Sequence, residues 1–388
     1  MSAVLRRELR LLLHCARTSL GAQEANLIKT LVENDIDWPY LIRRSLAHGV
    51  MPLLYRTLNS TCADAVPKVI LKQLREYFYA NGGRNLFLTR ELLKLLHLLE
   101  ANEITAIPYK GPVLAALVYG NLAFRQFGDL DILVRERDYE TAQRLLVDQG
   151  FRLTVEHEWE SEFTDATGRV AVDLHRRIAP REFPSPLTFE YLSKRLQPLL
   201  LAGTTVPNLS PEDTLLMLSI QITKDRYLKL AKICDVAELL RAHQSLNWAQ
   251  ALKQAKRLGG QRLLLFALCL TNHFLGAPLP QAAARELSSR EFFHELVEQV
   301  AQQFFQQGTK SSNDQLMPKR FDWLMRERFR DKLWPYYLRY MRDVIVPCEL
   351  DRHLLSLPRE LSFLYYLIRP VRLLCKYAAH GKPGQLTL

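Results

Sequence analysis

RQFGDLDILV, residues 125–134, combines an apolar strand pattern with two carboxylates. Residues two apart on a strand share one face, so Asp129 and Asp131 are predicted to project together while Leu130 and Ile132 face the core. Carboxylates this close repel each other unless a cation lies between them, and Mg²⁺ favours such oxygen ligands. The stretch therefore indicates a metal site, although an Asp-x-Asp pair also occurs by chance on solvated strand faces.

A third carboxylate follows in RVAVDLHRR, residues 169–177, which has the pattern of another strand. Asp173 has Val172 and Leu174 on the opposite face. If this strand pairs with residues 129–134, three carboxylates meet at one edge of the sheet. His175 lies on the same face as Asp173, where it would orient a ligand or simply line the site.

YKGPVLAALVYG, residues 109–120, places Lys110 and Gly111 at a predicted strand-to-helix turn. The backbone N–H groups of such a turn and the start of the helix suit phosphate oxygens. Lys110 would add a point charge for a triphosphate. The alternative is an ordinary turn.

The predicted elements give an α+β protein with a small mixed sheet between helical regions. Residues 3–100 carry apolar residues at helical spacing. Strands and short helices follow to about residue 210, including a short helix at 112–120, a hairpin formed by 159–166 and 169–177, and a possible hairpin at 199–210. Helices return afterwards. Residues 304–320 favour a linker or loop. The expected divisions are 1–100 (N-terminal helical), 101–210 (α/β core), 211–303 (helices packed on the core) and 304–388 (a basic C-terminal helical segment).

Composition narrows the class of protein further. The 388 residues are 48% hydrophobic and 24% charged, with a net charge of +11 that favours an anionic partner or simply reflects a basic solvated surface. The longest apolar run, residues 263–270, is too short to span a membrane, so no stable membrane insertion is expected. Six scattered cysteines without a C-x-x-C pair indicate buried thiols in the reducing cytoplasm rather than a zinc site.

Taken in order, the Gly-containing turn, the Asp-x-Asp strand and the later carboxylate resemble the polymerase-β-like nucleotidyltransferase superfamily. More narrowly, the chain is similar to a bacterial family of uncharacterised nucleotidyltransferases, and the similarity spans nearly the whole chain. The stretches that carry it are IDWPYLIRRSLAHGVMPLLY (36–55), YKGPVLAALVYGNLAFRQFGDLDILV (109–134), AVDLH (171–175) and YYLIRPVRLL (365–374).

The resemblance implies a nucleotidyltransferase core and assigns roles to particular residues. Gly111 matches the phosphate-cradling turn, Asp129 and Asp131 match the metal pair, and Asp173 matches the third carboxylate. One position departs from the pattern: Pro112 stands where the wider superfamily usually has a Ser whose hydroxyl contacts a phosphate.

Three further residues are weaker candidates for nucleotide contacts. Arg125 would reach a phosphate or remain a surface residue. Lys232 and Asp235 share one side of a predicted helix, where superfamily members often place nucleotide-contacting residues. An i,i+3 ion pair between them is the alternative explanation.

The implied function is an Mg²⁺-dependent nucleotidyltransferase that uses two ions. It would move an NMP group from ATP or another NTP to an unidentified acceptor, namely a small molecule, a peptide or protein, or an RNA end, and release pyrophosphate. One alternative is an inactive nucleotide-binding scaffold, which Pro112 favours. The other is a nucleic-acid-binding protein with a basic surface, which the lack of interleaved aromatics and of a recognised binding signature disfavours.

Overall fold

The computed structural model describes residues 6–180, 187–224, 229–288, 292–306 and 321–329, with short pieces at 331–332, 345–346, 363–367 and 369–370. The chain divides into two compact units, Met1–Met325 and Arg326–Leu388. The second unit is described only in short pieces.

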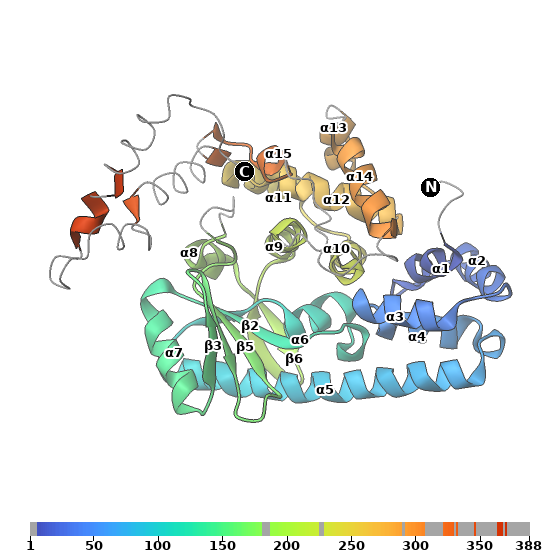
Figure 1. Ribbon diagram of the computed structural model, residues 1–388, viewed down its shortest axis with the longest axis horizontal. Coiled ribbons are helices and arrows are strands. Elements are labelled where there is room, and N and C mark those ends of the chain that lie inside the picture. Colours follow the sequence, from blue (N-terminus) through green and yellow to red (C-terminus); the bar gives the residue numbers. More distant parts are fainter. Residues whose placement is uncertain are drawn as a thin grey trace. The chain divides into compact units, whose positions relative to one another are not determined.

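Five helices form the N-terminal part: α1 (Arg7–Cys15), α2 (Ala22–Val32), α3 (Trp38–Ala47), α4 (Met51–Thr61) and α5 (Lys68–Ala101). The short 3₁₀ turn η1 (Ala63–Ala65) precedes α5. With 34 residues at 1.5 Å each, α5 is about 50 Å long. It contacts α4 at one end and β1 and α7 at the other, so it joins the N-terminal helices to the sheet (Figure 1).

The central sheet has five strands: β1 (Ala106–Pro108), β2 (Asp129–Val134), β3 (Arg152–Glu156), β4 (Glu160–Thr164) and β5 (Ala171–His175). Their spatial order is β1-β2-β5-β4-β3. β2 and β5 pair in parallel, whereas the other three pairings are antiparallel. The predicted mixed sheet and the predicted hairpin between β4 and β5 are therefore confirmed.

Short elements connect the strands. They are α6 (Gly111–Leu114), the π-helical turn η2 (Ala115–Tyr119), the 3₁₀ turns η3 (Leu122–Phe124) and η4 (Glu136–Asp138), α7 (Tyr139–Asp148), α8 (Phe189–Leu192) and η5 (Ser193–Arg195). The possible hairpin at 199–210 is confirmed as an antiparallel pair, β6 (Gln197–Leu201) and β7 (Thr204–Asn208).

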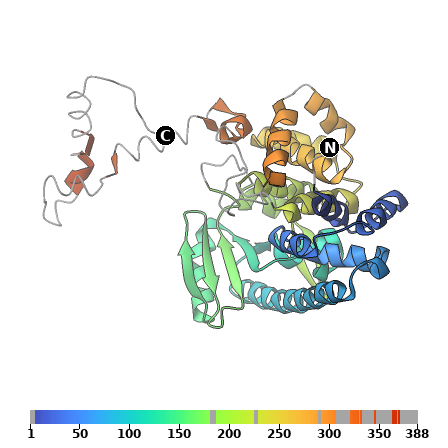
Figure 2. The ribbon, with the colours of Figure 1, turned by 45° about the vertical axis from the view of Figure 1, so that its right-hand side comes forward.

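The remaining helices of this unit are α9 (Pro211–Lys224), α10 (Leu230–Ala242), α11 (Trp248–Leu258), α12 (Gln261–Leu275), α13 (Gln281–Ser288), α14 (Phe292–Gln306) and α15 (Phe321–Met325). Two turned views show them gathered on one side of the sheet, with α5 on the other (Figures 1 and 2). The helix α12 is apolar nearly all round and is buried, as expected for a central helix.

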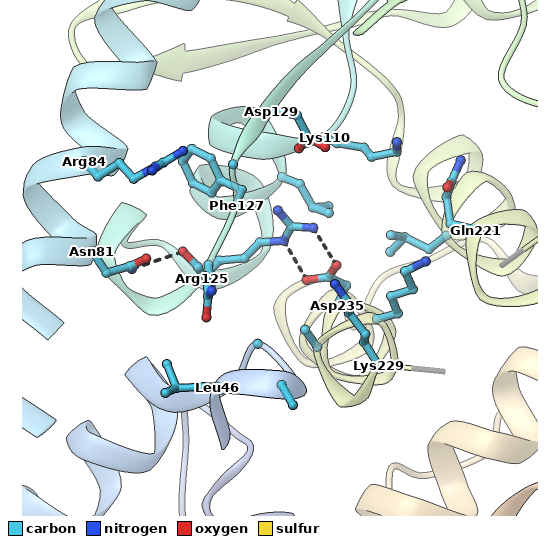
Figure 3. A pocket seen from close by; sticks show the side chains of 18 of the residues that line it. Leu46, Asn81, Arg84, Lys110, Arg125, Phe127, Asp129, Gln221, Lys229 and Asp235 are labelled. Carbon is cyan, nitrogen blue, oxygen red and sulfur yellow. Dashed lines mark hydrogen bonds and ion pairs between the residues drawn. The ribbon is translucent and has the colours of Figure 1, made fainter. Parts of the chain in front are cut away.

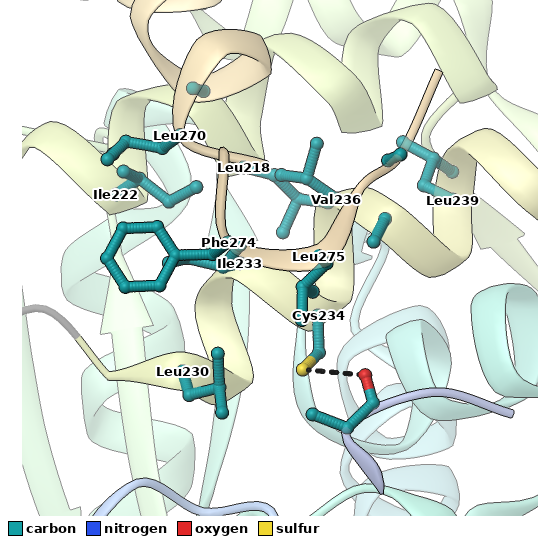
Figure 4. Close-up of a cluster of buried hydrophobic side chains, with 14 of the residues drawn as sticks. Leu218, Ile222, Leu230, Ile233, Cys234, Val236, Leu239, Leu270, Phe274 and Leu275 are labelled. Carbon is teal, nitrogen blue, oxygen red and sulfur yellow. Dashed lines mark hydrogen bonds between the residues drawn. The ribbon is translucent and has the colours of Figure 1, made fainter. Parts of the chain in front are cut away.

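The apolar faces of α9, α10 and α12 meet in one core cluster (Figure 4). Side chains such as Ile222, Ile233 and Phe274 are at most 4% exposed there. The cluster reaches the N-terminal helices, because the Cys234 thiol donates to the Ala16 carbonyl oxygen at 3.4 Å. Burial of this apolar surface fixes α9 and α10 against the rest of the unit.

Some of the other sequence predictions are confirmed, and others concern residues that the structure does not describe. The α+β class is confirmed by the element order. Most of the predicted linker at 304–320 and most of the basic C-terminal segment lie outside the described residues, and the boundaries at 100, 210 and 303 stay predictions. Cys15, Cys234 and Cys269 are free and buried, as expected, whereas the free Cys62 is only half-buried. Among the described residues, no helix is both long and apolar enough to cross a membrane.

Candidate active site

The parallel pairing of β2 with β5 brings the predicted carboxylates together. Asp131 and Asp173 are register partners, as the sequence predicted for adjacent strands. One ligand atom from each of Asp131, Asp173 and His175 lies within 4.8 Å of the others. Asp129 begins β2 on the same face and is exposed, whereas Asp131 is only 2% exposed.

The two oxygens of Asp131 have different surroundings. Lys110 Nζ donates to Oδ1, and His175 Nε2 lies 3.1 Å from the same oxygen. Oδ2 is buried and has no hydrogen-bond partner among the described residues. A buried carboxylate oxygen without a partner is costly unless something absent from the protein chain satisfies it.

The charges around Asp131 set the pKa values of its neighbours. Burial raises the pKa of Asp131, but Lys110 and the hydrogen bond from His175 outweigh it and hold that pKa well below its usual range. Burial, reinforced by Asp131 and Asp129, raises the pKa of Asp173 to about 7. Repulsion by Asp131 is the largest cause of the raised pKa of Asp129. A divalent cation between these carboxylates would relieve the repulsion, so the residues fit a bound metal ion.

His175 is held between two carboxylates. Its Nδ1 lies 3.1 Å from Glu160 Oε2, which is within ion-pair distance, although the two atoms do not have hydrogen-bond geometry. The ring of Tyr109 packs edge-on against it at 5.3 Å between centroids. Burial lowers the pKa of His175, but its contacts with Asp131 and Glu160 outweigh burial and raise it overall. Of the two roles considered for His175, orienting a ligand fits these contacts.

Gly111 allows the turn before α6 to approach β2 closely. Its φ of +52° is in the left-handed region that favours glycine, and a Cβ there would lie 3.1 Å from the carbonyl oxygen of Asp129. The expected short helix follows, but only its first four residues are α-helical (α6), and it continues as the π-helical turn η2. A helix this short adds little dipole, so the turn rather than the helix distinguishes this position.

A cleft of about 1110 Å³ opens beside the carboxylates (Figure 3). Its walls come from the α3–α4 junction, α5, the segment before β2, α9 and α10. Asp129 lines it, whereas Asp131 and Asp173 do not. The lining contains two acidic residues, Asp129 and Asp235, and six basic ones: Arg84, Lys110, Arg125, Lys224, Lys229 and Lys232.

Arg125 was expected either to contact a phosphate or to lie on the surface, and the structure shows that it is not a surface residue. Its side chain is 13% exposed, and Nε and Nη2 each donate to a different oxygen of Asp235 at 2.9 Å. Tyr119 also donates to Asp235, at 2.7 Å. On the opposite side, Asn81 and Asn85 of α5 donate to the Arg125 carbonyl oxygen at 3.4 and 2.7 Å. The resulting clamp joins α5, the segment before β2 and α10 (Figure 3).

Lys232 faces the cleft from α10, as does Lys224 from the last turn of α9. Burial, followed by repulsion from Lys110 and Lys224, lowers the pKa of Lys232 to about 7. Asp235, its expected i,i+3 partner, forms the bidentate pair with Arg125. The structure thus brings all eight predicted site residues to the carboxylates or to the cleft beside them.

Sequence reasoning missed Glu160, Tyr119 and the two asparagines of α5. A signal for Glu160 was present: the strand WESEFTDA alternates, and its hairpin with β5 places Glu160 opposite His175. No comparable local signal marked Tyr119 or Asn85, because their partners lie 116 and 40 residues away along the chain.

Carboxylates on two neighbouring strands after a Gly-containing turn are the arrangement that the sequence resemblance implied for a nucleotidyltransferase. The chain belongs to a family of uncharacterised nucleotidyltransferases, whose family model matches residues 34–276. It is therefore an enzyme that transfers nucleotidyl groups.

Other known proteins are more distant. A lincosamide antibiotic adenylyltransferase, LnuA, solved with lincomycin bound, is 18% identical over 39% of this chain and 94% of its own, with a TM-score of 0.31. An antigenic nucleotidyltransferase-like protein from Paracoccidioides brasiliensis is 17% identical over 52% of this chain and 95% of its own, also with a TM-score of 0.31. No curated protein matches the chain significantly.

Proposed function

We propose that the protein transfers an NMP group from a nucleoside triphosphate to an acceptor hydroxyl or similar nucleophile, with Mg²⁺ as cofactor and pyrophosphate as the second product. Asp129, Asp131 and Asp173 would hold the ions. The observation that carries this assignment is the buried Oδ2 of Asp131 beside Asp173, which has no hydrogen-bond partner in the part of the chain that the structure describes. When bound, two Mg²⁺ ions would neutralise the charge that develops on the phosphate oxygens during in-line displacement.

The cleft is the proposed binding site for the nucleotide. Its volume lies just above the usual range for small-molecule sites, and its lining carries four more basic than acidic residues. Lys110, Lys224, Lys229 and Lys232 would attract the phosphate groups, as would Arg84 from the opposite wall (Figure 3). Because Arg125 is already paired with Asp235, it would shape the cleft rather than bind a phosphate directly.

Lys110 would serve the carboxylates and the nucleotide together. It contacts Asp131 and also lines the cleft, so its ammonium group stands between the proposed metal site and the phosphates. Gly111 would let the backbone of the turn approach the same region, and the absence of a Ser hydroxyl at Pro112 leaves Lys110 as the main side chain there. The acceptor is proposed to be a small molecule, a peptide or protein, or an RNA end. The scattered cysteines favour a cytoplasmic location.

Nucleotide binding is expected to require Mg²⁺ and to weaken as the phosphate chain is shortened, because metal-free carboxylates repel phosphate. Calorimetric titration of ATP, GTP, CTP and UTP, each with Mg²⁺ or with EDTA, measures this. The matching mono- and diphosphates give the dependence on chain length. Equal affinity in EDTA for the preferred nucleotide would contradict a metal-centred site.

Lys110→Ala is expected to weaken Mg²⁺–NTP binding by roughly 1.5–3 kcal/mol, the usual contribution of a charge-assisted hydrogen bond. Lys72→Ala is the matched control, since Lys72 lies on exposed α5 surface and pairs only loosely, at 3.8 Å, with Glu76. Calorimetry gives the affinities, and circular dichroism checks that each variant is folded. A folded Lys110→Ala variant with wild-type affinity would place the phosphates elsewhere.

A further inference from the structure

His175 contacts Asp131 through one ring nitrogen. Its other ring nitrogen contacts a residue outside the proposed metal site. One ring nitrogen, Nε2, lies 3.1 Å from Asp131 Oδ1, and the other, Nδ1, lies 3.1 Å from Glu160 Oε2. The ring is 1% exposed, so bulk water does not reach either ring nitrogen. If Glu160 were absent, the ring would keep a polar partner at one nitrogen only.

Glu160 is itself held in place by the sheet. It is the register partner of His175 in the antiparallel β4–β5 pair. The adjacent residue, Ser161, is fully buried, and its hydroxyl accepts hydrogen bonds from Tyr139 at 2.8 Å and Gln143 at 2.9 Å. These bonds lock β4 against α7, which presents Glu160 to His175 in a fixed position.

Glu160 also reaches toward the cleft. Lys224 Nζ lies 3.9 Å from the same Oε2 that faces His175, and Lys224 lines the cleft from the last turn of α9. The series Lys224–Glu160–His175–Asp131 therefore runs from the cleft wall to the proposed metal ligand. Lys110 completes it by donating to the same Asp131 oxygen as His175.

We propose that Glu160 is a positioning residue of this enzyme: it holds the His175 ring so that Nε2 stays on Asp131 Oδ1, which leaves Oδ2 turned toward the bound cation. The proposal rests on the metal site of the proposed function. In this arrangement Oδ1 of Asp131 is held by Lys110 and His175, and Oδ2 is available as a metal ligand. Residues that orient a ligand in this way typically change metal affinity 10- to 100-fold when they are removed.

Two substitutions at Glu160 separate positioning from charge. Glu160→Ala removes the partner of Nδ1, so the ring and Asp131 gain freedom to turn. Glu160→Gln keeps a side chain of the same length with a carbonyl oxygen and an amide group, either of which can bond Nδ1, but removes the negative charge. Glu156→Gln is the matched control, because Glu156 lies exposed on the neighbouring strand β3.

Mn²⁺ binding to the full-length protein, measured by calorimetry and by electron paramagnetic resonance, tests the proposal, with the ring ¹⁵N shifts of His175 recorded in metal-free samples. Glu160→Ala is expected to weaken Mn²⁺ binding at least ~10-fold and to move the His175 shifts. Glu160→Gln should bind within about threefold of wild type, under ~1 kcal/mol, and Glu156→Gln should match wild type. Thermal melts check that each variant is folded.

The proposal is overturned if folded Glu160→Ala binds Mn²⁺ as wild type does, or if Glu160→Gln is as impaired as Glu160→Ala, which would mean that charge rather than orientation matters. Failure of the wild type to bind Mn²⁺ would overturn the metal site, and the role of Glu160 with it. The two failures are distinguishable, because the first appears only in the variants.

Discussion

Asp131→Asn is expected to lose Mg²⁺-dependent nucleotide binding and transfer, and also to lower the free energy of unfolding by about 3 kcal/mol, the low end of the cost of breaking a buried ion pair. Asp131 is 2% exposed and compensates the charges of Lys110 and His175. An asparagine keeps one oxygen acceptor but no charge, so the largely buried Lys110 would lose its main counterion. Urea unfolding followed by circular dichroism measures the stability, and calorimetry measures the binding.

Asp129→Asn is the matched control, two residues earlier on the same face of β2. Asp129 is exposed at the start of the strand, and repulsion from Asp131 is the largest cause of its raised pKa. Loss of its charge should therefore leave the free energy of unfolding near the wild-type value, while nucleotide binding and transfer are lost. Equal destabilisation by the two substitutions would contradict the distinct surroundings described for Asp131.

The sheet and its carboxylates could be predicted because their signals are local. Alternation along residues 129–134 and 171–175 identified two strands and the face that each carboxylate occupies. Once the two strands were taken as neighbours, Asp131 and Asp173 had to lie close together. A sheet converts a two-residue period in the sequence directly into a shared surface, so the centre of the site followed from pattern alone.

The surroundings of those carboxylates could not be predicted in the same way. Arg125 contacts Asp235, 110 residues later, because burial of the α9–α10–α12 faces brings α10 against the segment before β2. Lys110 was expected to point at phosphates, yet it also neutralises Asp131, since a largely buried ammonium group needs a counterion. Such pairings depend on how helices pack, and helix periodicity specifies a buried face without naming its partner.

The difference between α6 and the predicted helix has a related cause. PVLAALVYG has helical spacing. The segment must also turn back, because Tyr119 contacts Asp235 and Arg125 lines the cleft. The helix widens into a π-helical turn, and this turn ends at Gly120, whose φ is +63°. Tertiary contacts therefore override the local preference at the site where the structure is most constrained.

Asp173→Asn is expected to separate catalysis from binding. Asp173 faces Asp131 across the strand pair but does not line the cleft, so the proposed contacts with the nucleotide survive its substitution. We expect Mg²⁺–NTP affinity within about threefold of wild type, which is under ~1 kcal/mol. Transfer should fall at least ~10²-fold, the usual cost of removing one preorganised electrostatic contribution to the transition state.

The measurement follows label from α-³²P-labelled NTPs into a cell extract that supplies the acceptor, with calorimetry of the same samples for binding. Asp148→Asn, an exposed carboxylate at the end of α7, is the control for loss of one acidic charge. A scaffold without turnover would show no labelling even in the wild type. If the Asp173→Asn variant labels the acceptor as the wild type does, the third carboxylate does not belong to the site. The functional carboxylates would then be the two on β2, Asp129 and Asp131, rather than three.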